Sequence, residues 1–162
     1  MTRLEDAGHE PFMAEAIEQA QAALARGDRP IGAVIVHDGK VIARACNGTI
    51  TRGSHLVHAE LEALLGCGAY LREHGRQCTI YTTVEPCVMC IGAIVLANIR
   101  RIVFGMADNH MNARSIVEHN PYVRARIDLY QGGVLEDLCT ELMCRYSEDE
   151  TRLCLTGRRR GH

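Results

Sequence analysis

The hydrophobic positions along the chain follow helical spacing in some stretches and form short β-branched runs in others. The first stretch has helical spacing and ends at a stop-signal glycine: Met13, Ile17, Ala20, Leu24 and Gly27. It predicts an amphipathic helix that packs on a sheet. Two β-branched runs follow at 31–36 and 41–45, and Asp38-Gly39 between them is a typical hairpin turn. This part of the pattern therefore predicts a helix followed by a β-hairpin.

The same two periods alternate through the rest of the chain. The predicted elements are a helix over 58–70, a strand over 77–84, a helix that begins at Pro86, a strand over 102–104, a strand over 125–130 and a helix that carries Leu135, Leu138, Leu142, Met143 and Tyr146. Residues 107–121 are expected to form a loop with a short helical piece. This alternation indicates an α/β fold with helices on the faces of a sheet. Helical crossovers on both sides of the 77–84 strand predict parallel neighbours for it.

Length and composition favour one domain. The chain has 162 residues, of which 47% are hydrophobic, and this is enough to bury a sizeable core. We expect a single domain over 1–162, with a core over 10–146 and a helical tail over 147–162. The sequence shows neither an N-terminal apolar segment with a basic flank nor a run of about 18 apolar residues, so we expect no membrane span.

Charge and cysteine content set expectations about partners and location. The formal net charge is -2, so no general electrostatic attraction to nucleic acid is expected. Arg158, Arg159 and Arg160 form a small cluster, which we interpret as a solvated tail rather than a phosphate-binding site. Eight cysteines would suit a disulfide framework, but no export signal accompanies them, so we expect reduced thiols and a cytoplasmic location.

The residues that carry chemistry lie in two short segments. His58 is followed by Glu60, and Pro86-Cys87 leads to Cys90. One imidazole and two thiols suit Zn²⁺, and three protein ligands leave the fourth tetrahedral position for water. Glu60 is two residues from the histidine, so it approaches that water without being a fourth ligand, as a general acid/base should. His58, Cys87 and Cys90 are therefore the predicted zinc ligands, and Glu60 is the predicted catalytic residue.

These motifs resemble the zinc-dependent cytidine/deoxycytidylate deaminase superfamily, whose signature is H-x-E followed by P-C-x-x-C. Segments 83–90 and 104–108 are most similar to the branch that contains tRNA adenosine deaminases, guanine deaminases and fungal cytosine deaminase. The resemblance covers residues 10–146. It implies a three-layer α/β/α cytidine-deaminase-like fold with a mixed five-stranded sheet and zinc between two helix ends. It also implies a homodimer, which the apolar helix over 88–97 supports because one sheet would leave it partly uncovered.

The resemblance further implies three substrate-binding residues. Asn47 follows the second predicted strand, where composition alone favours a turn residue and the related deaminases have an asparagine that holds the base. The backbone N–H of Ala59 would also fix the base. Asp108 follows Phe104-Gly105, where related deaminases have a loop that borders the substrate pocket, so pocket rim and solvated loop both remain open.

The expected activity is hydrolytic removal of an exocyclic amino group with release of ammonia, in which Glu60 moves the protons. We expect a free nucleobase or nucleoside of the cytosine or guanine type, because phosphate contacts dominate nucleic-acid affinity and this chain is slightly acidic. Gly53-Ser54 and Leu56, before the metal histidine, are similar to fungal cytosine deaminase. The alternatives are a tRNA adenosine deaminase that forms inosine at the wobble position, and a non-catalytic structural zinc module.

Overall fold

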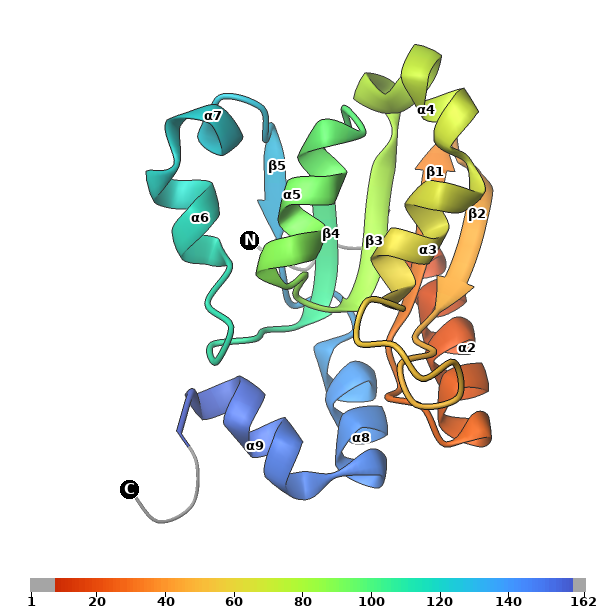
Figure 1. Ribbon diagram of the computed structural model, residues 1–162, viewed down its shortest axis with the longest axis vertical. Helices are drawn as coiled ribbons and strands as arrows, with labels where there is room; N and C mark the ends of the chain where they lie inside the picture. The colour runs from red at the N-terminus through yellow and green to blue at the C-terminus, as the bar shows by residue number, and fades with distance from the viewer. Residues whose placement is uncertain (1–7, 159–162) are drawn as a thin grey trace.

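A mixed sheet of five strands in the order β2-β1-β3-β4-β5 forms the middle of the structure (Figure 1). The structure is a computed structural model that describes residues 8–158. Its strands are β1 (Gly32–His37), β2 (Lys40–Cys46), β3 (Thr79–Val84), β4 (Arg101–Met106) and β5 (Leu129–Gln131). Its helices are α2 (Glu10–Arg26), α3 (Ala59–Gly66), α4 (Gly68–His74), a 3-10 turn (Gly75–Gln77), α5 (Val88–Leu96), α6 (Arg114–His119), α7 (Pro121–Arg124), α8 (Glu136–Tyr146) and α9 (Glu148–Thr156).

The strand directions confirm the mixed sheet and correct one expectation. Strand β1 pairs antiparallel with both β2 and β3, whereas β3 pairs parallel with β4, and β4 with β5. The prediction of parallel neighbours for the 77–84 strand, which is β3, is therefore confirmed for β4 and wrong for β1. The reason is that the hairpin places β1 between β2 and β3, so the crossover from β2 returns two positions across the sheet instead of one.

Helices cover both faces of the sheet, as the three-layer prediction requires. Because side chains alternate along a strand, Val34 packs in one core with α2 and α8, and its neighbour Ile35 packs in the other with α3 and α5. Helix α2 lies so close to β1 that a Cβ on Gly32 would be 2.0 Å from the carbonyl oxygen of Ala16. Only glycine fits at this contact.

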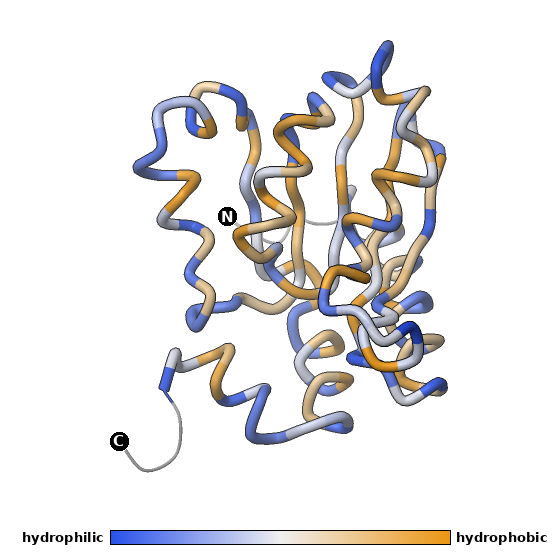
Figure 2. The backbone as a smooth tube through the Cα atoms, in the orientation of Figure 1, coloured by the Kyte–Doolittle hydropathy of each residue, from blue (hydrophilic) through white to orange (hydrophobic). Residues whose placement is uncertain are grey.

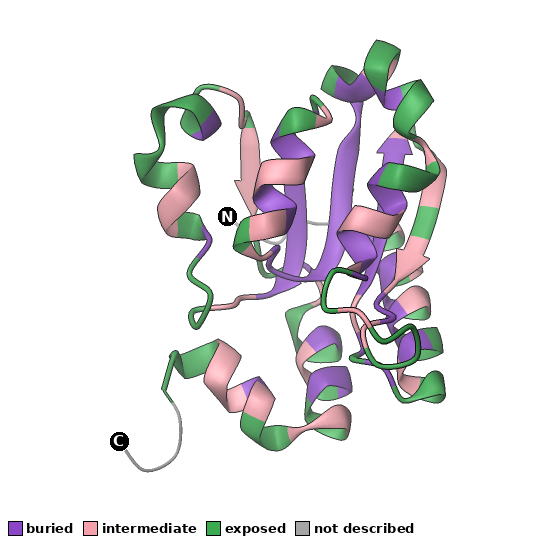
Figure 3. Cartoon of the chain, in the orientation of Figure 1, coloured by how far each residue is buried: buried purple, intermediate pink, exposed green. Residues whose placement is uncertain are grey.

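Burial is greatest in the three central strands. Figure 3 shows β1, β3 and β4 buried along most of their length, whereas the edge strands β2 and β5 are mainly half-buried. Hydropathy follows the same pattern, with apolar residues concentrated in the central strands and in α5 (Figure 2). The core is thus divided into two layers by the sheet.

The carboxyl ends of β2, β3 and β4 lie at one edge of the sheet, because β2 and β3 both run antiparallel to β1 and β4 runs parallel to β3. Asn47 follows β2, Glu85 follows β3, and Asp108 lies just beyond β4. The loop from α2 into β1 reaches the same edge, since β1 begins there. This edge gathers segments that are far apart in the sequence.

Several element boundaries differ from the prediction. The expected helix over 58–70 is two helices, which break at Cys67 between two glycines where its backbone leaves the helical region (φ -131, ψ 24). The helix expected from Pro86 begins at Val88, because Cys87 is still extended. The strand expected over 125–130 is the shorter β5, since hydrogen-bonded turns continue past α7 to Arg126.

The C-terminal segment contains helix α9, which the sequence pattern placed only as a helical tail. Arg158 is exposed, and Arg159 and Arg160 of the predicted cluster lie outside the described residues. All eight cysteines lie within the described range as free thiols. Within residues 8–158, none of the helices combines the length and the hydrophobicity that crossing a bilayer requires.

Candidate active site

The three predicted metal ligands meet at the carboxyl edge of the sheet. The ligand atoms of His58, Cys87 and Cys90 all lie within 4.8 Å of one another, and this is the one such cluster among residues 8–158. The Nδ1 atom of His58 is 3.5 Å from Sγ of Cys87 and 3.6 Å from Sγ of Cys90. Zinc bonds of about 2.1 Å to nitrogen and about 2.3 Å to sulfur, at a tetrahedral angle, separate the two ligand atoms by roughly 3.6 Å. The cluster therefore fits a tetrahedral zinc with an open fourth position.

The ligands lie at the N-termini of two helices. His58 precedes α3 and Cys87 precedes α5, each with an extended backbone. First-turn N–H groups have no acceptor within their own helix, and their partial positive charge favours a thiolate. A hydrogen bond from the Cys90 thiol, helped by His58 and opposed by burial, lowers the pKa of Cys87 to about 4. The same contact raises the pKa of Cys90, so one thiolate is available before metal binds.

Glu60 lies in the first turn of α3 and is only 3% exposed. The hydroxyl of Thr82 on β3 donates to Oε1 of Glu60 at 2.9 Å, and Oε2 is 3.6 Å from Sγ of Cys90. Burial raises the pKa of the Glu60 carboxyl, and the bond from Thr82 opposes that rise in part. The carboxyl group is thus beside the metal cluster, fixed in orientation and able to hold a proton more readily than a solvated glutamate.

Thr82 has two possible acceptors for its one hydroxyl proton. Its Oγ1 is 2.9 Å from Glu60 and 3.1 Å from the carbonyl oxygen of Val84. It donates to Glu60 when the carboxylate is charged; when Glu60 holds a proton, Thr82 accepts from it and donates to Val84. Thr82 belongs to none of the motifs in the sequence. The available signal was its position, because strand alternation puts this polar residue on the same buried face as Ile80.

Asn47 is 2% exposed and forms the turn that its composition suggested. Its Oδ1 accepts hydrogen bonds from the backbone N–H of Thr49 at 3.0 Å and from the Thr49 hydroxyl at 2.9 Å. Ala59, fully buried, is the first residue of α3, where helix geometry leaves the N–H without an intrahelical acceptor. The turn is therefore present, and the base-binding roles of Asn47 and Ala59 stay predictions.

Asp108 caps its own loop at the same edge. Its Oδ1 accepts from the backbone N–H groups of His110 and Met111, each at 3.0 Å, and its own N–H donates to Oε2 of Glu85 at 2.9 Å. Glu85 is 4% exposed, and its Oε1 accepts from the hydroxyl of Tyr130 at 2.6 Å. Glu85 thereby ties the start of the P-C-x-x-C segment to the Asp108 loop and to β5. The sequence pattern gave no sign of this role for Glu85.

A cavity of about 490 Å³ lies beside Asp108, and the C-terminal helix closes one side of it. Its lining comes from the α2–β1 loop, the Asp108 loop and α9: Arg29, Asp108, His110, Met111, Asp149, Glu150, Arg152, Leu153 and Cys154. Arg29 forms an ion pair with Glu150 at 2.6 Å. The hydrogen bond with Cys87 raises the pKa of His58, and the positive charge of Arg29 opposes part of that rise. Asp108 therefore lines a cavity, but no residue of the metal cluster does, so its place at the rim of the substrate pocket stays a prediction. The sequence pattern gave no sign that Arg29 and α9 would lie beside Asp108.

Comparison with known protein families identifies this arrangement. A family model described as the cytidine and deoxycytidylate deaminase zinc-binding region matches residues 6–106, which is more than half of the chain. The chain belongs to this family. The match includes Glu60 and the three predicted ligands His58, Cys87 and Cys90, which are the residues that would hold the zinc of the family.

Curated relatives of this deaminase family member include tRNA-specific adenosine deaminases. The protein from Bacillus subtilis (strain 168) is 43% identical over 103 residues, which are 61% of this chain and 62% of that protein. The protein from Agrobacterium fabrum is 42% identical over 98 residues, which are 60% of this chain and 64% of that protein. The matched segment thus spans less than two thirds of the length of both relatives.

Solved structures with the same fold include deaminases of two kinds. A structure from a study of A-to-I editing by tRNA:A34 deaminases at the wobble position has a TM-score of 0.68 and 36% identity, and the match covers 81% of this chain and 97% of that one. A guanine deaminase from Nitrosomonas europaea has a TM-score of 0.69 and 25% identity, and the match covers 85% of this chain and 83% of that one. These likenesses confirm the expected cytidine-deaminase-like fold.

These comparisons correct the expected substrate. A free nucleobase or nucleoside was expected from the acidic net charge and from Gly53-Ser54 and Leu56, but the relatives at 43% and 42% identity are named tRNA-specific adenosine deaminases. The expectation was wrong because three residues of local similarity count for less than about a hundred aligned positions. Net charge was a weak guide as well, since it is a sum over the whole surface and does not describe one pocket.

Proposed function

We propose that this protein is a zinc-dependent hydrolase that deaminates adenosine to inosine at the wobble position of transfer RNA. The similarity to tRNA-specific adenosine deaminases, at up to 43% identity, carries the proposal. The tRNA:A34 deaminase structure supports it, because the match extends over 97% of that chain at 36% identity, whereas the match to a guanine deaminase of the same identity, from Bacillus subtilis, extends over 62% of that chain. A tRNA substrate also agrees with the expected cytoplasmic location.

The site supports catalysis over a purely structural zinc module. Structural zinc sites close the coordination shell with a fourth protein ligand, whereas the cluster among the described residues has three. A buried glutamate beside the cluster is costly to keep unless it is paired, and here Thr82 holds Glu60. Such a carboxyl group has a use in proton transfer that a structural site does not require.

In the proposed mechanism the protein's own groups bind the base and move protons. Zinc, when bound, lowers the pKa of water from 15.7 to about 7. Glu60 takes a proton from the water that attacks C6 of adenine, passes a proton to the ring nitrogen, and then helps protonate the departing amine. Thr82 keeps the carboxyl group in place through both of its protonation states. Asn47 and the N–H of Ala59 would hold the base. In the overall reaction, water and adenosine give inosine and ammonia.

We also propose that the protein works as a homodimer through the face formed by α3 and α5. Leu65 and Leu96 on this face are 70% and 74% exposed, and Val88 is 47% exposed. A groove of about 380 Å³ between the two helices is lined mainly by leucine and alanine side chains. The exposed Leu65 and Leu96 and the groove lie on the same surface. A two-fold axis would bring this surface against the same surface of a second copy of the chain.

The test of the substrate is inosine formation in a tRNA anticodon stem-loop by the purified, zinc-loaded chain, with ammonia release from free bases and nucleosides measured in parallel. We expect inosine at the wobble position and no comparable turnover of the free compounds. Turnover of a free base or nucleoside without inosine in the stem-loop would contradict the proposal. No turnover of any amino-base, with one zinc per chain, would favour the structural module.

A further inference from the structure

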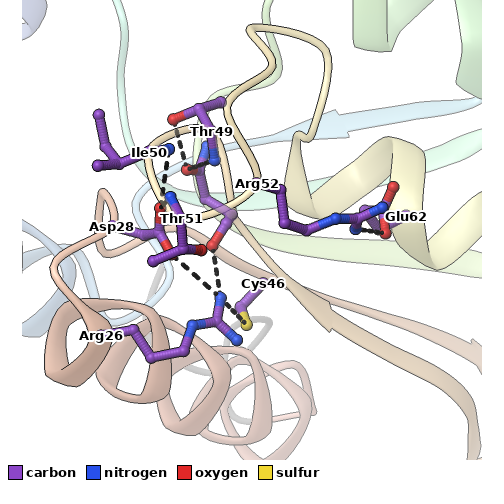
Figure 4. Close-up of polar contacts among 9 residues, drawn as sticks. Arg26, Asp28, Cys46, Thr49, Ile50, Thr51, Arg52 and Glu62 are labelled. Atoms are coloured by element: carbon purple, nitrogen blue, oxygen red, sulfur yellow. Dashed lines mark hydrogen bonds and ion pairs between the residues drawn. The ribbon is translucent and has the colours of Figure 1, made fainter.

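A buried carboxylate lies behind the loop that joins the candidate base-binding residue to the metal histidine. Asp28 is 0% exposed, and it follows Gly27, the left-handed residue (φ 87) that ends α2. Its Oδ1 accepts from the backbone N–H groups of Ile50 and Thr51, both at 2.9 Å, and its Oδ2 accepts from the Thr51 hydroxyl at 2.7 Å (Figure 4). A fully buried charge thus has three donors from one short segment.

Arg26 connects this carboxylate to the residue that starts the loop. One guanidinium nitrogen lies 3.3 Å from Oδ2 of Asp28 and donates to the backbone carbonyl of Asn47 at 2.9 Å (Figure 4). The backbone N–H of Asn47 donates to the carbonyl of Ile31 at 2.9 Å. The end of α2 and the loop that follows it therefore bind both the backbone carbonyl and the backbone N–H of Asn47.

The loop itself is closed on its own backbone. The N–H of Gly48 donates to the carbonyl of Val57 at 3.0 Å, so residues 47–57 begin and end at the same place. Asn47 is at one end of this closed loop, and His58 follows the other. Ile50 points outward and is 62% exposed, which leaves Asp28 as the main polar anchor on the inner side.

Burial alone would raise the pKa of Asp28. The hydrogen bonds from Thr51 and Ile50, together with the charge of Arg26, outweigh that effect and lower the pKa, so the carboxylate is charged at neutral pH. A charged acceptor makes stronger hydrogen bonds than a neutral one, and it costs more to leave without partners. The loop geometry is therefore strongly fixed from within.

We propose that Asp28 is a positioning residue for the deamination reaction, which holds the 47–57 loop so that Asn47 meets the base next to the metal cluster. The inference rests on the proposed function for its substrate. The N–H of Thr49 is a donor, so the oxygen of Asn47 faces Thr49 and the amide nitrogen is turned away as a donor. Adenine offers ring-nitrogen acceptors to such a group. Small displacements of a positioned group cost up to about 100-fold in rate, which makes the anchor a determinant of substrate binding.

The experiment compares the full, zinc-loaded chain with Asp28→Ala and Asp28→Asn. For the stem-loop substrate, we expect Asp28→Ala to raise KM about tenfold with a smaller change in kcat, because the interaction lost is one that binds the base. Asp28→Asn keeps one acceptor oxygen and should fall between it and the wild type. Hydrogen exchange at the amides of Ile50 and Thr51 should accelerate about tenfold in Asp28→Ala. Zinc should stay at one per chain.

Val123→Ala is the matched control, because Val123 is 7% exposed in α7 and its truncation destabilises the core away from the 47–57 loop and from the groove of the proposed dimer. It should lower Tm without changing KM or the exchange of the Ile50 and Thr51 amides. Unchanged KM in folded Asp28 variants, or equal effects in Val123→Ala, would overturn the inference. If the wild-type chain forms no inosine, the proposed function fails on its own. Loop exchange then decides the role of Asp28: wild-type protection in Asp28→Ala and Asp28→Asn rejects it.

Discussion

At the scale of single residues, Glu60 combines burial with a partner that serves both of its protonation states. It is 3% exposed, and burial raises its pKa, so the carboxyl group accepts a proton more readily than one in water. Thr82 donates to it at 2.9 Å and has a second acceptor, the carbonyl of Val84, at 3.1 Å. This geometry suits the proposed role of Glu60 in proton transfer, because the side chain keeps its partner in both protonation states.

Glu60→Gln should leave zinc binding intact and remove most of the turnover. The substitution keeps the size of the side chain but takes away its ability to carry a proton, and general acid–base catalysis contributes about 10²- to 10⁴-fold. The measurement is kcat on the anticodon stem-loop together with zinc per chain. Near-normal kcat in a folded, zinc-loaded variant would contradict the assigned role.

Thr82→Val should lower kcat about 10- to 100-fold, because a hydrogen bond to a charged group contributes about 1.5–3 kcal/mol and about 1.4 kcal/mol is tenfold in rate. Valine has the shape of threonine without the hydroxyl. The matched control is Thr79→Val, since Thr79 is also buried on β3 and three positions away, on the other face of the strand. Equal losses of kcat in the two variants would show that the effect is structural.

The residues that the sequence predicted differ in kind from those it missed. The sequence predicts the metal cluster and its glutamate because the spacing within two short motifs already indicates their chemistry: His58, Glu60, Cys87 and Cys90. Asp28, Thr82 and Arg29 act across elements, and a contact such as that between Asp28 and Thr51 depends on how α2 ends and how the loop turns. No local pattern contains that contact, so Asp28 and Arg29 emerge only when the chain is folded, whereas strand alternation already placed Thr82 on a buried face.

At the scale of elements, the candidate metal centre joins the N-termini of two helices, α3 and α5, that share one hydrophobic core. His58 begins α3 and Cys87 begins α5, and β3 leads directly into the second of them. One bound ion would connect both helix N-termini. Because the ligands come together only in the folded chain, metal binding adds to the free energy of folding.

Zinc removal should therefore lower Tm. Ligand at 1,000 times its Kd stabilises the folded state by about 4 kcal/mol, and a chain of this size shifts by about 2–4 °C per kcal/mol, so chelation should lower Tm by roughly 8–16 °C. The measurement is thermal unfolding with and without a chelator, alongside zinc per chain for Cys90→Ala. Cys144→Ala is the control, because Cys144 is exposed and distant in sequence from the cluster. One zinc per chain and normal Tm in Cys90→Ala would show that this thiol is not a ligand.

Element prediction succeeded where the period was long and uninterrupted, as in α2 and the β1–β2 hairpin with its Asp-Gly turn. It failed at boundaries that local backbone decides, such as the break at Cys67 between α3 and α4. The position of β1 between β2 and β3 was missed for another reason. Which strand a crossover returns beside is set by the packing of the whole sheet and not by the sequence of the crossover.

At the scale of the whole molecule, net charge is a poor guide to an RNA substrate. The formal charge of -2 sums every ionisable group, whereas binding depends on the groups around one opening. Arg29 and Arg152 line the cavity beside Asp108, each paired with a carboxylate of α9. Such pairs cancel in the sum but still place guanidinium groups at the rim, where a phosphate oxygen is a possible partner.

The proposed homodimer is the prediction that concerns the whole molecule. Helix α5 is apolar on nearly every side, and the sheet covers only the side that holds Cys90, Ile91, Ile94 and Val95. Leu96→Glu should therefore convert a dimer to a monomer, because a buried carboxylate without a partner is far more costly than an exposed one. Sedimentation at micromolar concentration measures the result.

Leu138→Glu is the matched control for this dimer prediction. Leu138 is 49% exposed on α8, which packs on the opposite face of the sheet, so the charge there should leave the dimer unchanged. Fully active wild-type protein that sediments as a monomer would refute the dimer, and a dimer that persists in Leu96→Glu would refute the α3–α5 face as its interface. Loss of the dimer in both variants would show that the effect of Leu96→Glu is not specific to this face. If Leu96→Glu is a monomer with the wild-type Tm, the single chain folds stably without its partner. If its Tm falls, dimerisation contributes to the stability of the folded chain, because binding of a partner stabilises the folded state.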